Sequence, residues 1–444
     1  MLRRAIAASA AAIVTVATLR RLRLAGIDAD MEWHRSQSAE EYRRAGERVL
    51  ILGAGFGALY AALSLDSKLR SDDDVSVLVV DRNNSMQFTP LLWTVANGVS
   101  NPNSVVVPIR NFQRGRRFHV MQAEIVGIDL DKREVHFSDA ESKPYDKLVI
   151  ALGSHVEVPD LPGVQDRALL FHTPADALQL RNRLVDAVEH AHRAIDSDER
   201  REWLTFVVSG AGDTGVEVAA TIYDYLSSGL LRAYPWLAAE PVRVVVVGRA
   251  DRVVPAHRTA TSEAVRRQLE TKGVEVWTGT SVEGVTDRAV QTSRGAIPAR
   301  TLFWAAGTTA PEVVKHLPVE HARNGAVVVD DQMRIPSHPE VRVIGDSAWG
   351  YDAETGEPLP ALAQAAQQQG KYAGRMLANE LHGRATSPYS FSPRGIMVLL
   401  GRHSGVAQLG PVTLSARPPF VRLGTHRGFE VGPIILTGMP AWLL

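Results

Sequence analysis

Two glycine-rich turns are the part of this 444-residue chain with the clearest chemical meaning. The first contains Gly53, Gly55 and Gly57, and Ala58 occupies the position where the pattern G-x-G-x-x-G/A accepts alanine. In such a turn the first glycine permits a tight bend, the second lets the backbone approach a diphosphate, and the third position allows helix and strand to pack closely. The spacing therefore predicts a nucleotide diphosphate bound at the N-terminus of a helix.

The elements on either side of the first turn agree with this prediction. An apolar run at 49–52 is short enough for a buried parallel strand, and a helix is expected over 58–65. A second apolar strand at 75–80 ends in Asp81, which lies 24 residues after Gly57, close to the spacing at which a carboxylate reaches a ribose hydroxyl. We therefore predict dinucleotide binding; the alternative is an ordinary strand, helix and strand joined by a glycine-rich turn.

A complete second fingerprint, Gly210, Gly212 and Gly215, begins 157 residues after the first. It follows an apolar strand at 203–209 and opens another helix. Two fingerprints indicate two nucleotides. The next strand of this half is expected at 242–247, and it ends in Gly248 and Arg249 where an acidic residue is usual.

Other strand ends add candidates for cofactor contact. A buried strand in 147–154 ends near Gly153, where the backbone could again approach a cofactor, and the stretch 301–307 closes the second half at Gly307. The stretch 342–346 reads as a strand that ends in Asp346. His155 and His257 are interpreted as structural or surface residues, because a lone histidine rarely signals a ligand.

Composition limits the chemistry. There are 49 basic and 49 acidic residues, so no charge excess points to nucleic acid, and 45% of the residues are hydrophobic. The absence of cysteine excludes a redox disulfide, a cysteine zinc site and an iron–sulfur cluster. No metal site is expected, and electron transfer would have to use a bound organic cofactor.

The fold class expected is α/β, with two Rossmann-like dinucleotide-binding domains, the second inserted in the first, and a smaller C-terminal region. The predicted limits are 48–160 and 329–384 for the first domain, 161–328 for the second, and 385–444 for the C-terminal region. Residues 1–47 form an extension. Within it, arginines bracket the apolar run 5–19, which is shorter than a spanning helix needs. The extension is a membrane-surface anchor, a presequence or a disordered segment.

Ordered motifs from about residue 48 to about 407 resemble the type II NADH:quinone oxidoreductases, which are single-subunit flavoenzymes without a proton pump. The residues that carry the resemblance include ILGAGFGAL, FTPLLWTVANG, YDKLVIALGS, GAGDTGVEVA, VRVIGDSA, ALAQAAQQQG and GIMVLLGR. The resemblance implies FAD on the first fingerprint with Asp81, and Asp346 on its ribityl chain. It also implies NADH or NADPH on the second fingerprint with Glu217 near the ring, and Gln368 and Gln369 on the quinone side of the flavin.

Without the resemblance, each of these residues has a simpler interpretation. Asp346 is then a helix cap, and Glu217 is a solvated helix residue. Gln368 and Gln369 then belong to a soluble helix face. The resemblance further implies a quinone partner and peripheral contact with the cytoplasmic face of a membrane, or an organellar location through an N-terminal presequence. A homodimer is an additional expectation. The alternatives are a soluble flavoprotein reductase of a small redox protein or other acceptor, and a flavin-bearing regulatory protein.

Three features depart from the family pattern. Asp213 occupies a place that is usually apolar or proline, where a carboxylate would repel a diphosphate unless it turned outward. The Gly248–Arg249 pair lacks the carboxylate that repels a 2′-phosphate, so we predict that discrimination against NADPH is lost. The chain also ends in an uncharged tail, 431–444, in place of an amphipathic docking helix.

Overall fold

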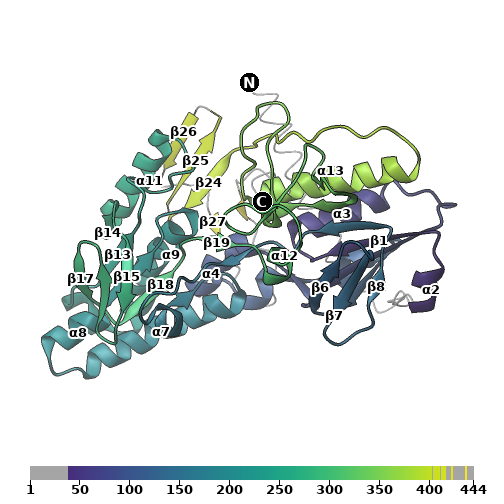
Figure 1. Cartoon of the computed structure of the whole chain (residues 1–444). Coiled ribbons are helices and arrows are strands. Elements are labelled where there is room, and N and C mark those ends of the chain that lie inside the picture. Colours follow the sequence, from purple (N-terminus) through teal and green to yellow (C-terminus); the bar gives the residue numbers. More distant parts are fainter. Residues whose placement is uncertain (1–38, 403, 411, 417–421, 424–435, 438–444) are drawn as a thin grey trace. The chain divides into compact units, whose positions relative to one another are not determined.

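A computed structural model describes residues 39–402, 404–410, 412–416, 422–423 and 436–437 (Figure 1). The chain divides into two compact units. The first unit takes the chain up to Gln87 together with Val106–His155 and Thr308–Pro393. The second takes Phe88–Val105, Val156–Gly307 and the chain from Arg394. The predicted extension before residue 39 and most of the tail 431–444 lie outside the described residues.

A six-stranded sheet forms the centre of the first unit, in the order β21-β22-β9-β1-β2-β5. All neighbouring pairs are parallel except β21 with β22. The central strands are buried on both faces, which their uninterrupted apolar sequences predict. The strands are β1 (Glu47–Leu52), β2 (Val75–Asp81), β5 (Phe118–Gln122), β9 (Lys147–Ile150), β21 (Arg334–Ile335) and β22 (His338–Val343).

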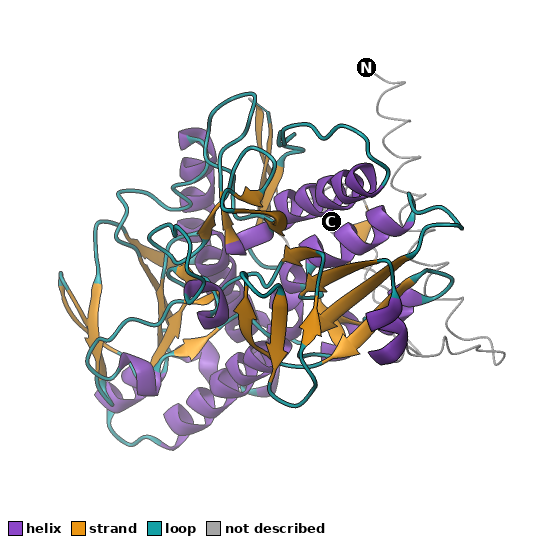
Figure 2. Cartoon of the chain, turned by 45° about the vertical axis from the view of Figure 1, so that its right-hand side comes forward, coloured by secondary structure: helices purple, strands orange, loops and turns teal. Residues whose placement is uncertain are grey.

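Two helices of the first unit, α3 (Phe56–Asp66) and α13 (Ala363–Leu381), pack with their backbones in close approach. A Cβ atom on Gly370 would lie 2.2 Å from the carbonyl oxygen of Gly57, and one on Gly374 would lie 2.3 Å from that of Ala61. No side chain fits at either glycine. Figure 2 shows these helices as neighbours. The close packing holds α13 against the helix that follows the first glycine-rich turn.

The second unit is built on a five-stranded parallel sheet in the order β11-β18-β12-β13-β14. Its long helix α7 (Pro174–Arg193) begins at a capping box in which Thr173 and Asp176 bond each other's backbone N–H groups. The strands are β11 (Leu169–Leu170), β12 (Thr205–Ser209), β13 (Arg243–Val247), β14 (Val274–Trp277) and β18 (Thr301–Trp304). The other main helices are α8 (Ser197–Trp203), α9 (Asp213–Asp224) and α11 (Thr259–Lys272).

Short elements complete both units. The remaining strands of the first unit are β3 (Ser85–Gln87), β4 (Val106–Pro108), β6 (Ile125–Asp129), β7 (Glu134–Phe137), β8 (Lys143–Pro144), β19 (Thr308–Thr309), β20 (Val327–Val328) and β23 (Ala348–Trp349). Those of the second include β15 (Val282–Val285), β16 (Ala289–Thr292), β17 (Gly295–Pro298), β24 (Ile396–Leu399), β25 (Gly405–Leu409) and β26 (Val412–Ala416). The short helices include α2 (Ala39–Arg44), α4 (Leu92–Ala96), α5 (Arg110–Gln113), α6 (Val164–Arg167), α10 (Leu231–Ala233) and α12 (Glu312–Lys315).

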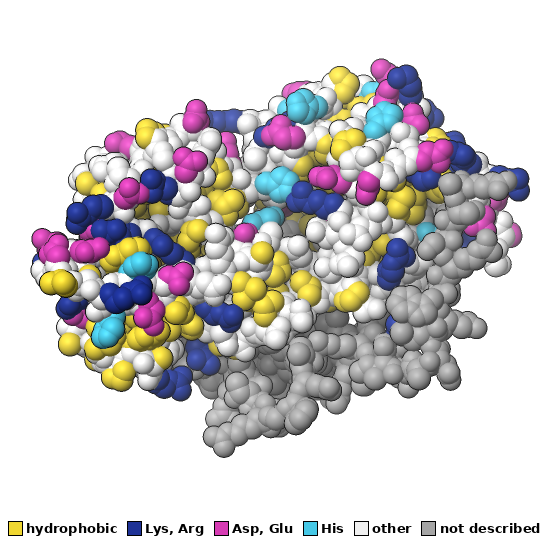
Figure 3. All heavy atoms as spheres, turned by 90° about the horizontal axis from the view of Figure 1, so that it is seen from below, with side chains coloured by type: hydrophobic (Ala, Val, Ile, Leu, Met, Phe, Trp, Pro, Cys, Tyr) yellow, Lys and Arg dark blue, Asp and Glu magenta, His cyan; other side chains and the backbone are white. Residues whose placement is uncertain are grey.

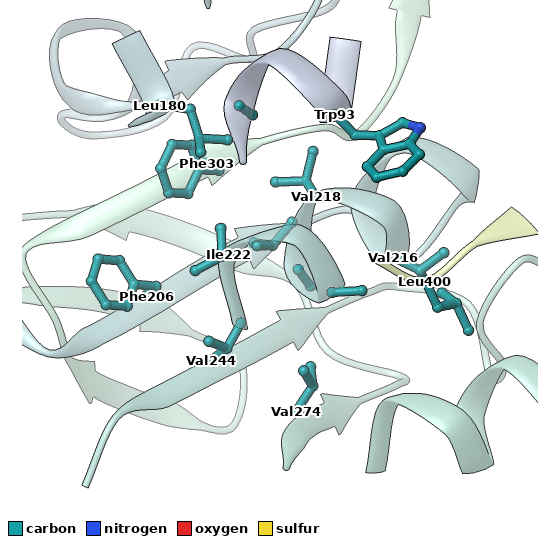
Figure 4. Packing of buried hydrophobic residues seen from close by; sticks show 14 of the residues in the cluster. Trp93, Leu180, Phe206, Val216, Val218, Ile222, Val244, Val274, Phe303 and Leu400 are labelled. Carbon is teal, nitrogen blue, oxygen red and sulfur yellow. The ribbon is translucent and has the colours of Figure 1, made fainter. Parts of the chain in front are cut away.

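The units do not follow the predicted domain limits. The segment Phe88–Val105 was expected inside the first domain, but it belongs to the second unit, where α4 packs against α7. Trp93 is 2% exposed and lies in the same apolar cluster as Val218 and Phe303 (Figure 4). The long-range burial of an apolar segment therefore overrides its position in the sequence.

The described part of the expected C-terminal region is not separate either. Residues 385–393 belong to the first unit, and the antiparallel sheet β24-β25-β26 belongs to the second. Gln268 on α11 donates 2.7 Å to the Ser415 hydroxyl, and the Thr261 hydroxyl donates 2.8 Å to Gln408. These bonds attach the C-terminal sheet to the second unit.

Acidic and basic side chains are interspersed on the face shown in Figure 3, in keeping with the balanced charge of the sequence. Over the part of the chain that the structure describes, no helix combines the length and the apolar character that a membrane span requires.

Candidate nucleotide-binding sites

The first glycine-rich turn follows β1 directly. Gly53 has φ +99°, and a Cβ atom there would lie 2.4 Å from the carbonyl oxygen of Ala151. Its N–H donates 2.7 Å to the carbonyl of Val80 at the end of β2. Glycine is required at this position for its backbone angle and for lack of space.

Gly55 is the N-cap residue of α3, and as a glycine it has no side chain with which to cap the helix. No atom would lie within 4 Å of a Cβ built on Gly55. The first N–H groups of a helix have no partners within the helix, and together with the helix dipole they attract an anion. The open space and the uncapped helix therefore fit the diphosphate of a dinucleotide. Gly57 instead fits closely, since a Cβ there would lie 3.3 Å from Ile344.

The other candidates of the first unit gather at the same edge of the sheet, because β22, β9, β1 and β2 are parallel neighbours. Asp81 accepts bonds of 2.8 Å from the Ala54 N–H and 2.7 Å from the Asn83 N–H, so its carboxylate also braces the glycine-rich turn. The Ser154 hydroxyl donates 2.9 Å to Asp346. Gly153, at φ +69°, has open space where a side chain would be. Asp81, Gly153 and Asp346 thus lie around one edge, in an arrangement that fits FAD.

The two glutamines of α13 are engaged by backbone groups. Gln369 is 3% exposed and accepts a bond of 2.6 Å from the Gly345 N–H, which ties α13 to the turn that carries Asp346. Gln368 donates 2.9 Å to the Ser392 carbonyl and accepts 3.1 Å from the Ser392 N–H. In this structure both side chains hold loops in place, and their expected contact with quinone stays a prediction.

The second glycine-rich turn repeats the geometry of the first. Gly210 follows β12 with φ +114°, and a Cβ on Gly215 would lie 1.8 Å from the Gly210 carbonyl oxygen. Gly212 is the N-cap residue of α9, which has no side-chain cap, and the space beside it is open. The turn therefore also fits a diphosphate.

The strand ends beside the second turn carry the other predicted residues. Gly248 follows β13, and a Cβ on it would lie 2.5 Å from that of Ala211, inside the glycine-rich turn. An acidic side chain, which is usual at this place in the fold, would therefore have no room at position 248. Arg249 is exposed, and no ion pair or side-chain hydrogen bond of it is found among the described residues. Gly307, three residues after β18, has φ +81°. Its carbonyl accepts a hydrogen bond of 3.1 Å from the Glu157 N–H.

Glu217 lies one turn into α9, largely buried, and its Oε1 accepts a bond of 3.0 Å from the N–H of Leu399 in β24. Desolvation raises the pKa of this carboxyl to about 8, and the charge of Asp213 adds to the rise. A carboxyl group with this pKa carries a proton at neutral pH and can donate it.

Sequence reasoning missed the contact between Asp213 and His257. His257 is 5% exposed, so it is not a surface residue, and its Nε2 lies 2.6 Å from Oδ1 of Asp213. The signal in the sequence was the unusual aspartate in the glycine-rich turn, which calls for a compensating partner. Nothing in the sequence placed a histidine 44 residues away beside it.

The chain is similar to known proteins over most of its length. The profile of the family "Pyridine nucleotide-disulphide oxidoreductase" matches residues 47–370. The chain is 32% identical over 385 residues to a type II NADH:quinone oxidoreductase of Mycobacterium tuberculosis, covering 83% of this chain and 81% of that protein. It is 29% identical to a demethylphylloquinone reductase of Synechocystis, covering 84% and 91%.

A solved structure with the same fold is NDH2 from Plasmodium falciparum in complex with NADH. It has a TM-score of 0.74 and 20% identity, covering 83% of this chain and 91% of that one.

Proposed function

Because the chain belongs to the type II NADH:quinone oxidoreductases, within the pyridine nucleotide-disulphide oxidoreductase family, we propose that it passes a hydride from NAD(P)H through FAD to a quinone. The balanced reaction consumes NAD(P)H, one proton and the quinone, and yields NAD(P)⁺ and the quinol. The observation that carries the proposal is a pair of glycine-rich turns, each of which joins the carboxyl end of a central parallel strand to a helix with glycine as its N-cap residue. Disulfide chemistry has no place here, since the chain has no cysteine.

In the first unit the residues that would hold FAD are those of the glycine-rich turn, with Asp81, Gly153 and Asp346. The N-terminus of α3 binds the diphosphate, Asp81 orients a ribose, and Asp346 accepts a hydroxyl of the ribityl chain. When bound, FAD supplies the redox chemistry that no side chain of this protein can supply. The protein contributes position and electrostatics.

In the second unit the glycine-rich turn at Gly210, Gly212 and Gly215 binds the diphosphate of the donor. Arg249 is the cation available to the adenosine ribose, and Gly248 stands where a carboxylate would repel a 2′-phosphate. We therefore include NADPH with NADH as a donor. Gly307, three residues after β18, is a further candidate for contact with the same ligand.

Glu217 is the residue that we propose as the proton source for quinone reduction. Its raised pKa keeps it protonated at neutral pH, and the Leu399 N–H holds Oε1, so the proton is left on Oε2. Gln368 and Gln369 remain candidates for the quinone side of the flavin. Their present bonds to Ser392 and Gly345 favour a role in shaping that side.

We also propose peripheral contact with a membrane, since quinones of respiratory chains dissolve in lipid. The apolar run 5–19 with its flanking arginines is suited to an anionic membrane surface. Deleting residues 1–27 is expected to release the protein from sedimenting membranes without loss of ferricyanide reduction. Complete sedimentation of the deletion variant would assign the contact to another segment.

A steady-state assay tests the proposed function directly. The purified full-length chain is expected to be yellow, to release FAD on denaturation, and to reduce a short-chain quinone with NADH or NADPH. Ferricyanide serves as an acceptor that takes electrons without protons. A protein without flavin, or one that reduces ferricyanide but no quinone at any pH, would contradict the proposal.

A further inference from the structure

Asp213 is the first residue of α9 and follows Gly212, so it stands where the donor diphosphate is proposed to bind. Its side chain is 40% exposed. A free aspartate at this place can turn back and bond the open N–H groups of its own helix, as capping residues do. It would then compete with the diphosphate for the same donors and repel its charge.

His257 engages this carboxylate. The Nε2 atom lies 2.6 Å from Oδ1 of Asp213, and since an ionised carboxylate can only accept, Nε2 donates. The imidazole side chain is 3% exposed, and its Nδ1 is buried without a hydrogen-bond partner among the described residues. Within the described part of the chain, the one hydrogen bond of this buried ring is thus the bond to Asp213.

The segment that carries His257 is fastened to the glycine-rich turn. The N–H of Val254 donates 2.6 Å to the carbonyl of Ala211, and the N–H of His257 donates 3.0 Å to the carbonyl of Val254. Val254 has φ +40°, a conformation that a β-branched residue adopts only under constraint from its surroundings. The Ser262 hydroxyl adds a bond of 2.6 Å to the Val253 carbonyl. The backbone therefore presents the imidazole to Asp213 in a defined position.

We propose that His257 is a positioning residue of the donor site, which holds the Asp213 carboxylate away from the N-terminus of α9 and thereby leaves that terminus to the diphosphate. The inference rests on the proposed function, because it assumes a dinucleotide at this turn. It explains how the chain accommodates an acid as the first residue of α9, where a diphosphate is proposed to bind. His257 itself makes no contact with the ligand.

The proposal predicts coupling between two positions and is tested by a double-mutant cycle. ADP-ribose, which carries the diphosphate but no nicotinamide, is titrated into the purified full-length protein by calorimetry. His257→Leu removes the donor and is expected to raise the Kd at least tenfold. His257→Gln, which retains an N–H donor, is expected to stay within threefold of the unmodified protein. Flavin content of each variant checks that the chain is folded.

Removing the carboxylate as well is expected to remove the need for the imidazole. His257→Leu combined with Asp213→Asn should therefore recover a Kd within threefold of the unmodified protein, and Asp213→Asn alone should bind at least as tightly. Equal losses from His257→Leu in both backgrounds would show a merely structural role and overturn the inference. Weaker binding by Asp213→Asn alone would also overturn it. Absence of ADP-ribose binding by the unmodified protein would instead overturn the proposed function and this inference together.

Discussion

The backbone N–H of Leu399 donates a hydrogen bond of 3.0 Å to Glu217, across 182 residues of sequence. This bond joins the C-terminal sheet to the helix that follows the second glycine-rich turn. It lowers the pKa of Glu217, but desolvation outweighs it and the pKa rises to about 8. The Glu217 carboxyl, one helical turn from Asp213, is therefore protonated at neutral pH.

The first prediction concerns stability against pH. The pKa of Glu217 in the folded protein lies above its ordinary value near 4.5, so the folded state favours the protonated carboxyl. The stability that this side chain contributes to the folded state is therefore fully present below about pH 4.5 and is lost as the pH rises through about 8. The free energy of unfolding relative to Glu217→Gln is expected to fall between about pH 5 and about pH 8, and urea unfolding at several pH values measures it. A constant difference across this range would contradict the raised pKa.

The same substitution separates proton supply from electron supply. Glu217→Gln keeps the shape and the acceptor for the Leu399 N–H but has no acidic proton. Loss of a general acid lowers rates by about 10²–10⁴-fold, so quinone reduction at pH 7 is expected to fall toward that range. Ferricyanide reduction, which needs no proton for the acceptor, is expected to change by less than about threefold. Equal losses with both acceptors would assign Glu217 to donor binding instead.

The third prediction uses the two open glycines as controls for each other. Neither Gly55 nor Gly212 has an atom within 4 Å of an added Cβ, and neither has a positive φ, so a side chain begins in open space at both positions. Gly55→Val is expected to purify folded but without flavin, because the side chain occupies the space of the diphosphate. Gly212→Val is expected to keep its flavin and to lose at least tenfold in donor affinity. Absorbance at the flavin band and ADP-ribose titration read out both variants.

Much of this arrangement follows from local sequence. The turns at Gly53 and Gly210 were predictable because strand, glycine spacing and helix are contiguous and each glycine has a steric reason. The capping box at Thr173 is equally local. These features depend on neighbours within about a dozen residues, which is the range over which periodicity and turn chemistry act.

What could not be predicted depends on contacts between distant segments. The burial of Trp93 in the second unit, the bond from Leu399 to Glu217, and the close fit of Gly248 against Ala211 all come from packing. Gln369 is a clear case, since its amide oxygen accepts the N–H of Gly345, a partner that lies 24 residues away and that the sequence does not indicate. Sequence identifies such residue types without identifying their partners.

The fourth prediction concerns a charge cluster around the buried Arg342 in the first unit. Glu380 contacts Arg334, Arg342 and Lys147, and Arg342 is fully buried. Glu380→Gln leaves these cations without their shared carboxylate, and breaking a buried ion pair costs about 3–5 kcal/mol. Urea unfolding at pH 7 measures the loss. Glu312→Gln is the matched control, since Glu312 pairs with Lys315 on an exposed helix, and a change below about 0.5 kcal/mol is expected there.

The last prediction concerns donor choice and requires a variant that the fold tolerates. Restoring an acid as Gly248→Glu is unsuitable, because even the Cβ atom would lie 2.5 Å from that of Ala211. Arg252 is a poor candidate for phosphate binding, since it already donates 2.9 Å to Thr259 and 2.8 Å to the Pro255 carbonyl. Arg249 is the exposed cation at the end of β13 and is therefore the residue to test.

Arg249→Ala is expected to lower kcat/KM for NADPH by about tenfold or more, because one charge-assisted hydrogen bond is worth about 1.5–3 kcal/mol. kcat/KM for NADH, which has no 2′-phosphate, is expected to change by less than about threefold. Arg252→Ala serves as the matched control of equal charge change and is expected to leave the NADPH to NADH ratio near that of the unmodified protein. Because the attraction is electrostatic, the NADPH advantage conferred by Arg249 is also expected to shrink as salt rises from about 0.05 to 0.5 M. An unmodified protein that prefers NADH a hundredfold, or an Arg249→Ala variant with an unchanged ratio, would show that this arginine points only into solvent.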